Sequence, residues 1–340
     1  MQRMKKYASV VPGLLIAVAV AAAARFLEGL LPIHLIGASV IALFIGMGIN
    51  ALRKPSALVA GGLKFTSKRV LKLAIILLGA SLSMRDILTV GRLSLMVMCF
   101  TLLTCFGGGY LVGRSLGLNW KLSNLISAGT GICGGSAIAA IAPVIDAQDR
   151  DIAYAMSATF LFDMVMILMF PFLGHWLGMS DMAYGLWAGT AVNDTSSVVA
   201  AGYAFSEAAG DFATMVKLTR TLSIIPTVLI FSVINVREKC RMNVAVEGER
   251  VNVLTLFPRF ILCFLGLALF NSVGLIPAAA SAFLKDLSKF LMVAAPAAIG
   301  LNTDFREMQK AGLRPMLHGF IISALVVVVA LLVEMAMGLV

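Results

Sequence analysis

Long apolar segments that follow one another along the whole chain are the feature that most limits its fold. About eleven such segments, each of roughly 18–25 residues, occur in 340 residues, and a helix of that length crosses a bilayer. They are expected at residues 8–27, 33–51, 70–90, 93–114, 122–145, 151–172, 182–205, 212–235, 255–273, 281–303 and 314–338. The runs lack the apolar/polar alternation of a transmembrane β-barrel. The sequence therefore predicts an all-α polytopic membrane protein, with residues 1–340 as a single integral membrane domain.

The composition and the placement of charge agree with a membrane protein. Residues are 60% hydrophobic and 13% charged, whereas a soluble domain carries about 25% charged residues. The net charge of +10 does not indicate nucleic acid, because Lys and Arg gather in short connecting segments, as cytoplasmic loops require; membrane lipid is the expected partner. Residues 52–72 hold six Lys and Arg and no acidic residue, which predicts a cytoplasmic link with an interfacial helix at 57–68. The N-terminus, two spans earlier, is expected in the cytoplasm, and residues 237–252 are expected to form a cytoplasmic linker loop.

Two of the apolar segments are interrupted by residues that break helices. Residues 128–140 contain Gly-Thr-Gly-Ile-Cys-Gly-Gly-Ser, and residues 188–200 contain Gly-Thr-Ala-Val-Asn-Asp-Thr-Ser-Ser. Both begin with Ala-Gly-Thr, sixty positions apart. Unwound backbone at membrane depth is tolerated only where protein, water or substrate satisfies its N–H and C=O groups. A pair of interrupted segments is therefore typical of a transporter binding site, and we expect two discontinuous helices that meet at the midplane.

The path of these two segments stays open at the level of sequence. Each could cross the membrane, or each could be a re-entrant hairpin, the two entering from opposite faces and meeting tip to tip. The layouts differ only for the loops near 146–151 and 173–181, which contain almost no Lys or Arg. Acidic residues say little about orientation.

A second repeat relates two stretches that lie far apart in the sequence. Residues 79–91 and 300–312 share two glycines and an arginine at a constant offset of 221, and an acidic residue follows the arginine in both. Counting spans places the first copy on the outer face and the second on the inner face. That relation predicts inverted repeats.

Candidate substrate-binding residues come from the first interrupted segment and from one later helix. Glycines let a substrate approach bare backbone, and the N–H groups of the half-helix that follows form an anion cradle; close helix packing is the alternative. Two cations at spacing i, i+3 share one helix face inside an apolar run. Their expected partner is an anionic substrate or a carboxylate (Asp163, Asp194 or Asp211), and snorkelling to a surface is the alternative. The substrate-binding candidates are Gly131, Cys133, Gly134, Gly135, Ser136, Lys217 and Arg220.

Candidate coupling-ion residues come mainly from the second interrupted segment. A carboxylate with nearby amide, hydroxyl and freed carbonyl oxygens can bind a proton or Na⁺, although the same residue types also cap helices. Asn302 follows Pro296 and Gly300 and belongs either to the site or to the interfacial end of its segment. The coupling-ion candidates are Asn193, Asp194, Thr195, Ser196, Asp163 and Asn302.

Catalytic and cofactor motifs do not occur in the sequence. It has no Ser/His/Asp grouping, no H-E-x-x-H and no phosphate-binding G-x-x-x-x-G-K, so we expect no enzymatic activity and no ATP-driven transport. We expect no metal or cofactor other than Na⁺ or H⁺ as a coupling ion. The histidines His34, His175 and His318 lie near predicted segment ends and are expected at the interface.

Three motifs carry a family resemblance that covers nearly the whole chain. Residues 129–140, residues 189–202 and Gly-Leu-Asn-Thr-Asp at 300–304 resemble the YeiH-type sulfate exporter family of bacterial inner-membrane proteins, which is related to bile-acid/sodium symporters and cation/proton antiporters. The resemblance implies a panel and a core domain and two inverted five-helix repeats, at 31–175 and 176–340, after an extra N-terminal helix within 1–30. It also implies that the fourth helix of each repeat, segments five and ten, is broken, whereas the motifs place the breaks in segments five and seven.

The expected function is secondary transport of a small anion, of the sulfate or organosulfonate class, coupled to Na⁺ or H⁺ by alternating access; the family label implies export. A cation/proton antiporter is one alternative, with Asp194 and Asp163 carrying the ions. A channel, or a membrane subunit that serves a partner protein, is another. Small residues on helix faces permit a homodimer without requiring one.

Overall fold

The computed structural model describes residues 10–30, 38–241, 259–303 and 312–340, and these parts of the chain are helical. Five helical stretches are long and apolar enough to cross a membrane: Val11–Gly29, Met84–Ser115, Arg150–Trp176, Glu207–Arg237 and Leu313–Ala336. Ala38–Leu52 and Arg259–Ser272 are shorter apolar helices. The predicted all-α, multi-pass membrane architecture is confirmed.

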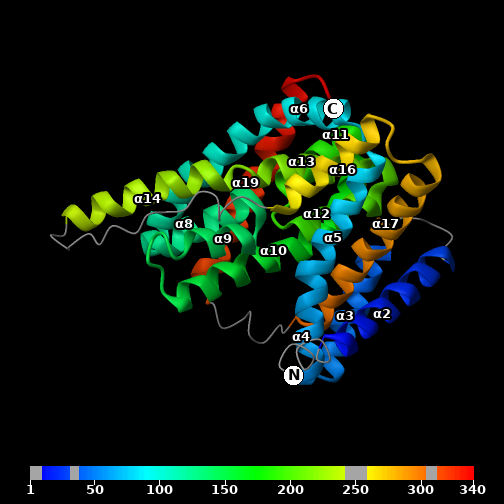
Figure 1. Cartoon of the computed structure of the whole chain (residues 1–340). Helices are drawn as coiled ribbons and strands as arrows, with labels where there is room; N and C mark the ends of the chain where they lie inside the picture. The colour runs from blue at the N-terminus through cyan, green and yellow to red at the C-terminus, as the bar shows by residue number, and fades with distance from the viewer. Residues whose placement is uncertain (1–9, 31–37, 242–258, 304–311) are drawn as a thin grey trace.

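The helices follow the predicted segments in order, with labels as in Figure 1. They are α2 (Val11–Leu30), α3 (Ala38–Leu52), α4 (Ala57–Phe65), the π turn η1 (Thr66–Val70), α5 (Leu71–Leu78), the 3₁₀ turn η2 (Gly79–Ser81), α6 (Met84–Leu103), η3 (Thr104–Gly108), α7 (Gly109–Ser115), α8 (Trp120–Ala128), η4 (Gly129–Cys133), α9 (Gly135–Ile141), α10 (Asp149–Trp176), α11 (Asp181–Ala191), α12 (Thr195–Phe205), α13 (Glu207–Thr221), α14 (Ile224–Arg241), α16 (Arg259–Ser272), α17 (Ala278–Leu301) and α19 (Leu313–Ala336).

The helices pack into two bodies that lie side by side (Figure 1). In the scaffold body, α17 packs against α2, α3 and α5, and α16 packs against α5. In the core body, α13 packs against α6, α11 and α12, while α10 packs against α8, α12 and α19. Helix α12 joins the bodies through contacts with α3 and α17. Each body takes helices from both halves of the chain; the predicted repeat halves remain a prediction.

The first interrupted segment is a re-entrant hairpin, built from α8, η4 and α9. Its two ends lie together, because the Lys121 ammonium at the start of α8 donates to the Asp146 carbonyl after α9, at 2.8 Å. Asn119, which caps α8, donates to a carboxylate oxygen of Asp151 near the start of α10, at 3.1 Å. The base of this hairpin therefore lies at the N-terminal end of α10.

The second interrupted segment, α11 and α12, is also a re-entrant hairpin. Ser206, after α12, donates to the Asp181 carboxylate at the start of α11, and the Tyr184 hydroxyl donates to the Ala201 carbonyl across the hairpin at 3.0 Å. The rings of His175 and Phe205 stack with centroids 4.3 Å apart, which ties this base to the C-terminal end of α10. The bases of the two hairpins therefore lie at opposite ends of α10, as the tip-to-tip layout predicts.

Segment ten is not broken, which corrects the expectation drawn from the family resemblance. Helix α17 runs through Pro296 without interruption from Ala278 to Leu301. Proline removes one backbone donor near the end of the helix, whereas a break needs the flexible glycines and capping side chains of the two tips. Of the predicted repeat copy at 300–312, residues 304–311 lie outside the described residues, as do residues 1–9, His34 and residues 242–252 of the predicted linker loop.

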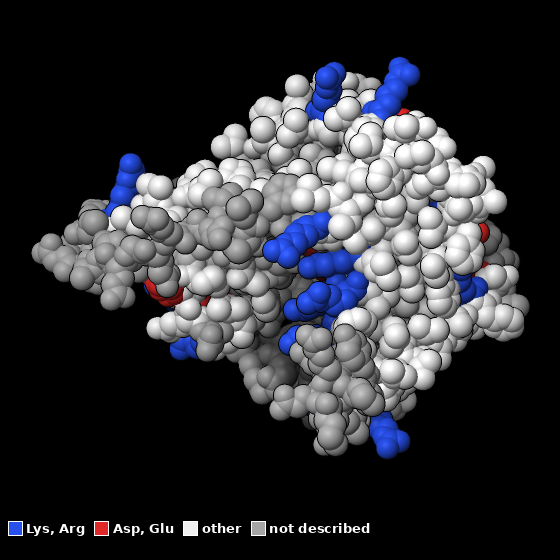
Figure 2. Space-filling model, viewed as in Figure 1, with Lys and Arg blue, Asp and Glu red and all other residues white. Residues whose placement is uncertain are grey.

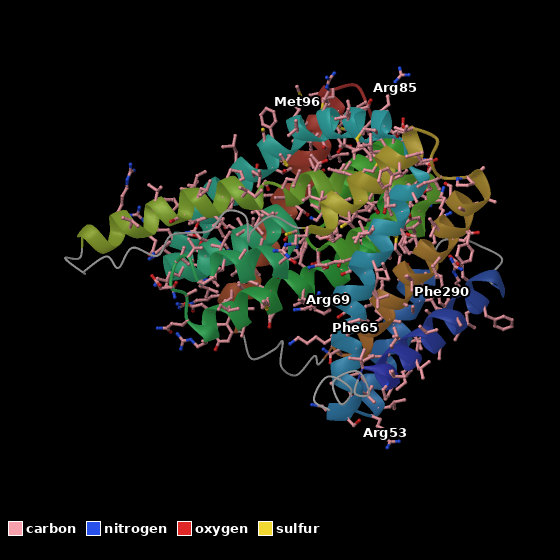
Figure 3. All side chains as sticks on the ribbon, in the orientation of Figure 1. Arg53, Phe65, Arg69, Arg85, Met96 and Phe290 are labelled. Atoms are coloured by element: carbon pink, nitrogen blue, oxygen red, sulfur yellow. The ribbon has the colours of Figure 1, made fainter. Side chains whose placement is uncertain are left out.

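Segment three begins earlier than its hydropathy suggests. Helices α4, η1, α5 and η2 run without a gap from Ala57 to Ser81, so the predicted helix at 57–68 is present but continues into segment three, and its interfacial position stays a prediction. Exposed Lys and Arg side chains therefore lie along a helix of the scaffold body, and Figure 2 shows cations gathered beside a hollow in the middle of this face. Figure 3 places Arg69 there and Arg53 at the far end of the scaffold body. Residues 237–241 of the predicted linker loop likewise belong to helix α14, because Arg, Glu and Lys are good helix formers.

Candidate functional site

The tips of the two hairpins touch at Gly134 and Asp194. Gly134 has φ +61° and ψ −133°, between the π turn η4 and the helix α9, a conformation that is essentially restricted to glycine. A Cβ atom added there would lie 2.8 Å from a carboxylate oxygen of Asp194 and 3.0 Å from its Cβ. The bare backbone of one tip therefore packs directly against the side chain of the other.

Lys217 and Arg220 hold the carbonyl ends of the two incoming half-helices. The Lys217 ammonium donates to the Val192 carbonyl at 2.8 Å. The Arg220 guanidinium donates through Nε to the Gly131 carbonyl at 2.7 Å and through a terminal nitrogen to the Thr130 carbonyl at 2.9 Å. Cations at helix C-termini oppose the negative end of the helix dipole. Both side chains are fully buried, so the snorkelling alternative is wrong.

Asp163 binds the backbone of the second break on the side of α12, opposite to the carbonyl bound by Lys217. It is buried in the middle of α10, and its carboxylate accepts the backbone N–H groups of Asn193 at 3.0 Å and Asp194 at 3.2 Å. Asp194 caps α12 by accepting the N–H of Ser196 at 3.0 Å. The predicted cap is therefore present, and it leaves one Asp194 oxygen facing the other tip.

Three buried polar atoms near the tips have no hydrogen-bond partner within the described structure: a terminal nitrogen of Arg220, the Thr130 hydroxyl and the Asn193 amide oxygen. Buried polar atoms are normally paired, with protein or with ordered water. One donor, one hydroxyl and one acceptor thus remain for water, an ion or a substrate group. They come from both hairpins and from α13, the helix that braces both tips.

The structure brings most of the predicted site residues together at the tips. Gly131, Cys133, Asn193, Ser196 and Asp163 are buried there; Asp194, Thr195 and Gly135 are partly exposed, and Ser136 is exposed on the first turn of α9. Asn302 lies elsewhere: it is exposed at the end of α17, about 9 Å along the helix axis beyond Pro296.

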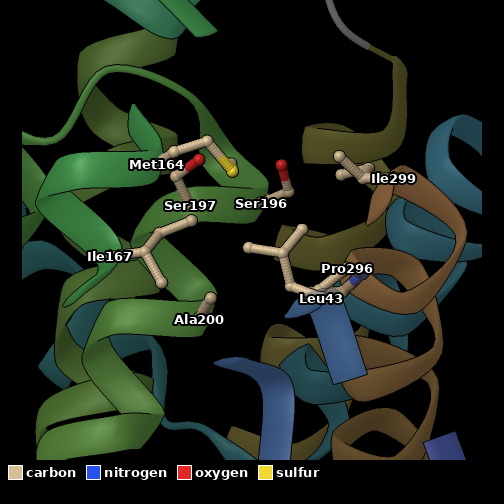
Figure 4. Close-up of a pocket in the computed structure, with 8 residues that line it drawn as sticks. All are labelled: Leu43, Met164, Ile167, Ser196, Ser197, Ala200, Pro296 and Ile299. Atoms are coloured by element: carbon tan, nitrogen blue, oxygen red, sulfur yellow. The ribbon is translucent and has the colours of Figure 1, made fainter. Parts of the chain in front are cut away.

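A small pocket marks the seam between the two bodies beside the second tip. Figure 4 shows α10 and α12 on one side, with Ser196, Ser197 and Ala200 at the first turns of α12, and Leu43 and Pro296 of the scaffold body on the other. Most of the lining is apolar or small. The second tip therefore meets the scaffold body across a smooth surface without ion pairs among the described residues.

Comparison with known proteins identifies the family. The family model described as Conserved hypothetical protein 698 matches residues 12–319. A UPF0324 membrane protein of Clostridium tetani is 55% identical over 343 residues, covering 98% of this chain and 99% of that protein. A UPF0324 membrane protein of Streptococcus pyogenes serotype M3 is 40% identical, covering 96% of this chain and 97% of that protein. The chain belongs to this family.

The resemblance to the YeiH-type family is thereby confirmed, and the UPF0324 family places the chain among bacterial multi-pass membrane proteins. Sequence reasoning missed three groups that the structure makes conspicuous. Thr130 lies within the first motif, where its residue type predicts no role. His318, expected at the interface, is fully buried and bonds the Gly109 carbonyl at 3.0 Å and the Ser123 hydroxyl at 3.1 Å. Glu334 is the one acidic residue in the apolar segment 314–338. An ionisable residue inside such a segment is by itself a sign of a functional or buried position.

Glu334 gives a prediction about stability. It is fully buried in α19, and neither carboxyl oxygen has a hydrogen-bond partner in the described structure. An unpaired carboxylate ion at such a place is strongly unfavourable, so we expect Glu334→Gln, which keeps the shape and carries no charge, to leave the melting temperature unchanged or raised. Thermal unfolding of the detergent-solubilised protein tests this. A clear loss of stability would mean that the carboxylate has a partner the contacts do not reveal.

Proposed function

We propose that this protein is a secondary transporter of a small anion, of the sulfate or organosulfonate class, coupled to Na⁺ or H⁺. The observation that carries the proposal is the pair of re-entrant hairpins that meet halfway along α10, where Gly134 packs on Asp194. Helix α10 has 28 residues. At the rise of an α-helix, its length exceeds the thickness of the hydrocarbon core of a bilayer. Its middle, at Asp163, therefore lies near the bilayer midplane, where transporters of this kind bind their substrates.

The balance of charge at the tips supports coupled transport. Lys217 and Arg220 are two cations, and Asp163 and Asp194 are two carboxylates, so the four charges cancel when all are ionised. An anion that entered this low-dielectric region would add an uncompensated negative charge, which is unfavourable. A proton or Na⁺ bound at Asp163 or Asp194 offsets it. Coupling then follows from electrostatics, because anion and cation bind better together than apart.

The seam between the bodies supports alternating access. The core body carries both tips, and α12 meets the scaffold body through small and apolar side chains, including Ala200 and Ser197. At this surface one body can move against the other without breaking an ion pair, whereas the pairs of Lys285 and Lys289 on α17 with Glu207 on α13 join the two bodies elsewhere. Such movement would expose the tips first at the cytoplasmic face, which the basic loops place at the N-terminal end of α10, and then at the opposite face of the bacterial inner membrane.

A cation/proton antiporter remains the second candidate, for one specific reason. Lys217 and Arg220 already donate to the backbone carbonyls of the tips, so neither cation depends on a substrate anion for a partner. In that case Asp163 and Asp194 alone would carry the transported ions.

Changing Asp194 to Asn tests the coupling. Asparagine caps helices as well as aspartate does, so the fold should persist while the charge is lost. In proteoliposomes we expect sulfate uptake by the variant to lose its response to an imposed Na⁺ or pH gradient, while exchange of sulfate for sulfate continues. Asp181→Asn, an exposed residue at the base of the same hairpin, is the matched control.

Three results would contradict the proposal. Gradient-driven uptake unchanged in Asp194→Asn would remove this residue from coupling. Cation-driven proton movement in the wild type without any anion flux would favour the antiporter. Passive flux that ignores every gradient would favour a channel.

A further inference from the structure

A row of four exposed cations lies on one face of the scaffold helix that runs from Ala57 to Ser81. They are Lys64, Lys68, Arg69 and Lys72. Lys68 and Lys72 share a face by ordinary α-helical spacing, i and i+4. The π turn η1, at Thr66–Val70, bonds i to i+5, and this wider turn brings Lys64 and Arg69 onto the same side. The row spans about 12 Å along the helix from Lys64 to Lys72.

Among the described residues, these cations have no acidic partner. No carboxylate forms an ion pair with any of the four in the described structure, and the one aromatic contact is that of the Lys72 ammonium, 5.4 Å from the centre of the Phe260 ring. The scaffold cations near the other end of the molecule differ, because Lys285 and Lys289 both pair with Glu207. Like charges in one row repel one another unless water or a counter-ion lies between them. Within the described structure, the row is therefore available to bind anions.

The row faces the space between the two bodies (Figure 3). Lys64 lies nearer the start of the helix, and the whole row belongs to the basic stretch 52–72, which is predicted to face the cytoplasm. Figure 2 shows cations beside the hollow of this face, and Figure 3 places Arg69 between the two bodies. An anion bound by the row would therefore lie between the two bodies.

We propose that this cationic row binds small divalent oxyanions and delivers them to the hairpin tips. The proposal rests on the anion-transport function above and gives it a source of anion selectivity, which the internally bonded Lys217 and Arg220 do not supply. The Arg69 guanidinium offers a fork of N–H donors that matches two oxygens of a tetrahedral anion, and the three lysines add point charges. A doubly charged oxyanion therefore binds better than chloride. The phosphate of a lipid headgroup shares this chemistry, and the test separates the two.

The experiment compares Lys68→Gln/Arg69→Gln with a control that removes two exposed cations elsewhere, Arg85→Gln/Arg92→Gln on α6. The purified full-length proteins are titrated with sodium sulfate and with phosphate by thermal shift, against sodium chloride at equal ionic strength. We expect both oxyanions to stabilise the wild type and the control. We expect the Lys68/Arg69 variant to bind them about ten-fold or more weakly, since two charge-assisted contacts are lost. The second arm repeats the titration in neutral phosphatidylcholine nanodiscs and in discs that contain phosphatidylglycerol.

Sulfate or phosphate stabilisation that survives in neutral discs and falls in the Lys68/Arg69 variant supports the row as an oxyanion site. Equal affinity in the variant and the wild type overturns it, as does a lack of response of the wild type to both anions. Stabilisation that requires phosphatidylglycerol also overturns it, because the row would then bind lipid. Proteoliposome uptake separates the two proposals: gradient-driven sulfate uptake with an unchanged KM in the variant rejects the row alone, whereas no anion flux in the wild type rejects the transport function.

Discussion

Gly134→Ala is expected to abolish transport and to lower the melting temperature strongly. The residue combines two constraints, a positive φ that alanine adopts poorly and a contact in which a new Cβ would lie 2.8 Å from the Asp194 carboxylate. The backbone strain alone costs about 1–3 kcal/mol, and relief of the clash requires the two tips to move apart. Since Asp194 also caps α12, the displacement would reach the second hairpin as well.

The next residue provides the control for this prediction. An added Cβ at Gly135 meets no atom within 4 Å, and the residue begins helix α9 with ordinary helical geometry. We expect Gly135→Ala to fold with a melting temperature close to that of the wild type, because alanine is the better helix former. Thermal unfolding and proteoliposome uptake of both variants measure the difference. Equal behaviour of the two variants would show that the tips do not meet as described.

The positions of both breaks could be predicted from sequence, because glycines and capping side chains in an apolar run have few other uses. Asp194 illustrates this: its type and its place before Thr195 predict a helix cap, and the cap is present. The path of the chain beyond each break could not be predicted. The path depends on contacts that leave no pattern in the hydropathy of the sequence. The hydrogen bond from Lys121 to the Asp146 carbonyl is one of them.

The cations show a different limit of sequence reasoning. The spacing of Lys217 and Arg220 predicts a shared inward face, but their partners are backbone carbonyls, and a backbone carbonyl leaves no mark in a sequence. The charge of the four cations in the row lowers the local hydropathy, so the sequence predicts a cytoplasmic link there. In the structure they belong to a long helix whose π turn sets their direction, and nothing in Thr66–Val70 predicts a π turn.

The largest loss of stability is expected at Arg220. Its guanidinium satisfies two carbonyls at the first tip, at 2.7 and 2.9 Å, in a fully buried position. Arg220→Met keeps much of the volume and removes both donors, so the carbonyls of Thr130 and Gly131 are left without partners. Hydrogen bonds from a charged donor contribute about 1.5–3 kcal/mol each. We therefore expect a loss of about 3–5 kcal/mol, seen as a melting temperature lower by roughly 5–10 °C.

Two further variants show whether geometry or charge is responsible. Arg220→Lys retains the charge but lacks the fork that reaches two acceptors, so we expect it to lose about half of this stability and to transport poorly. Arg92→Met removes an exposed arginine from α6 and should change stability by less than about 0.5 kcal/mol. If Arg220→Lys were as stable and active as the wild type, the positive charge near Asp163 would be the important property. The first tip would then be held by its packing against Asp194 rather than by the bonds to its carbonyls.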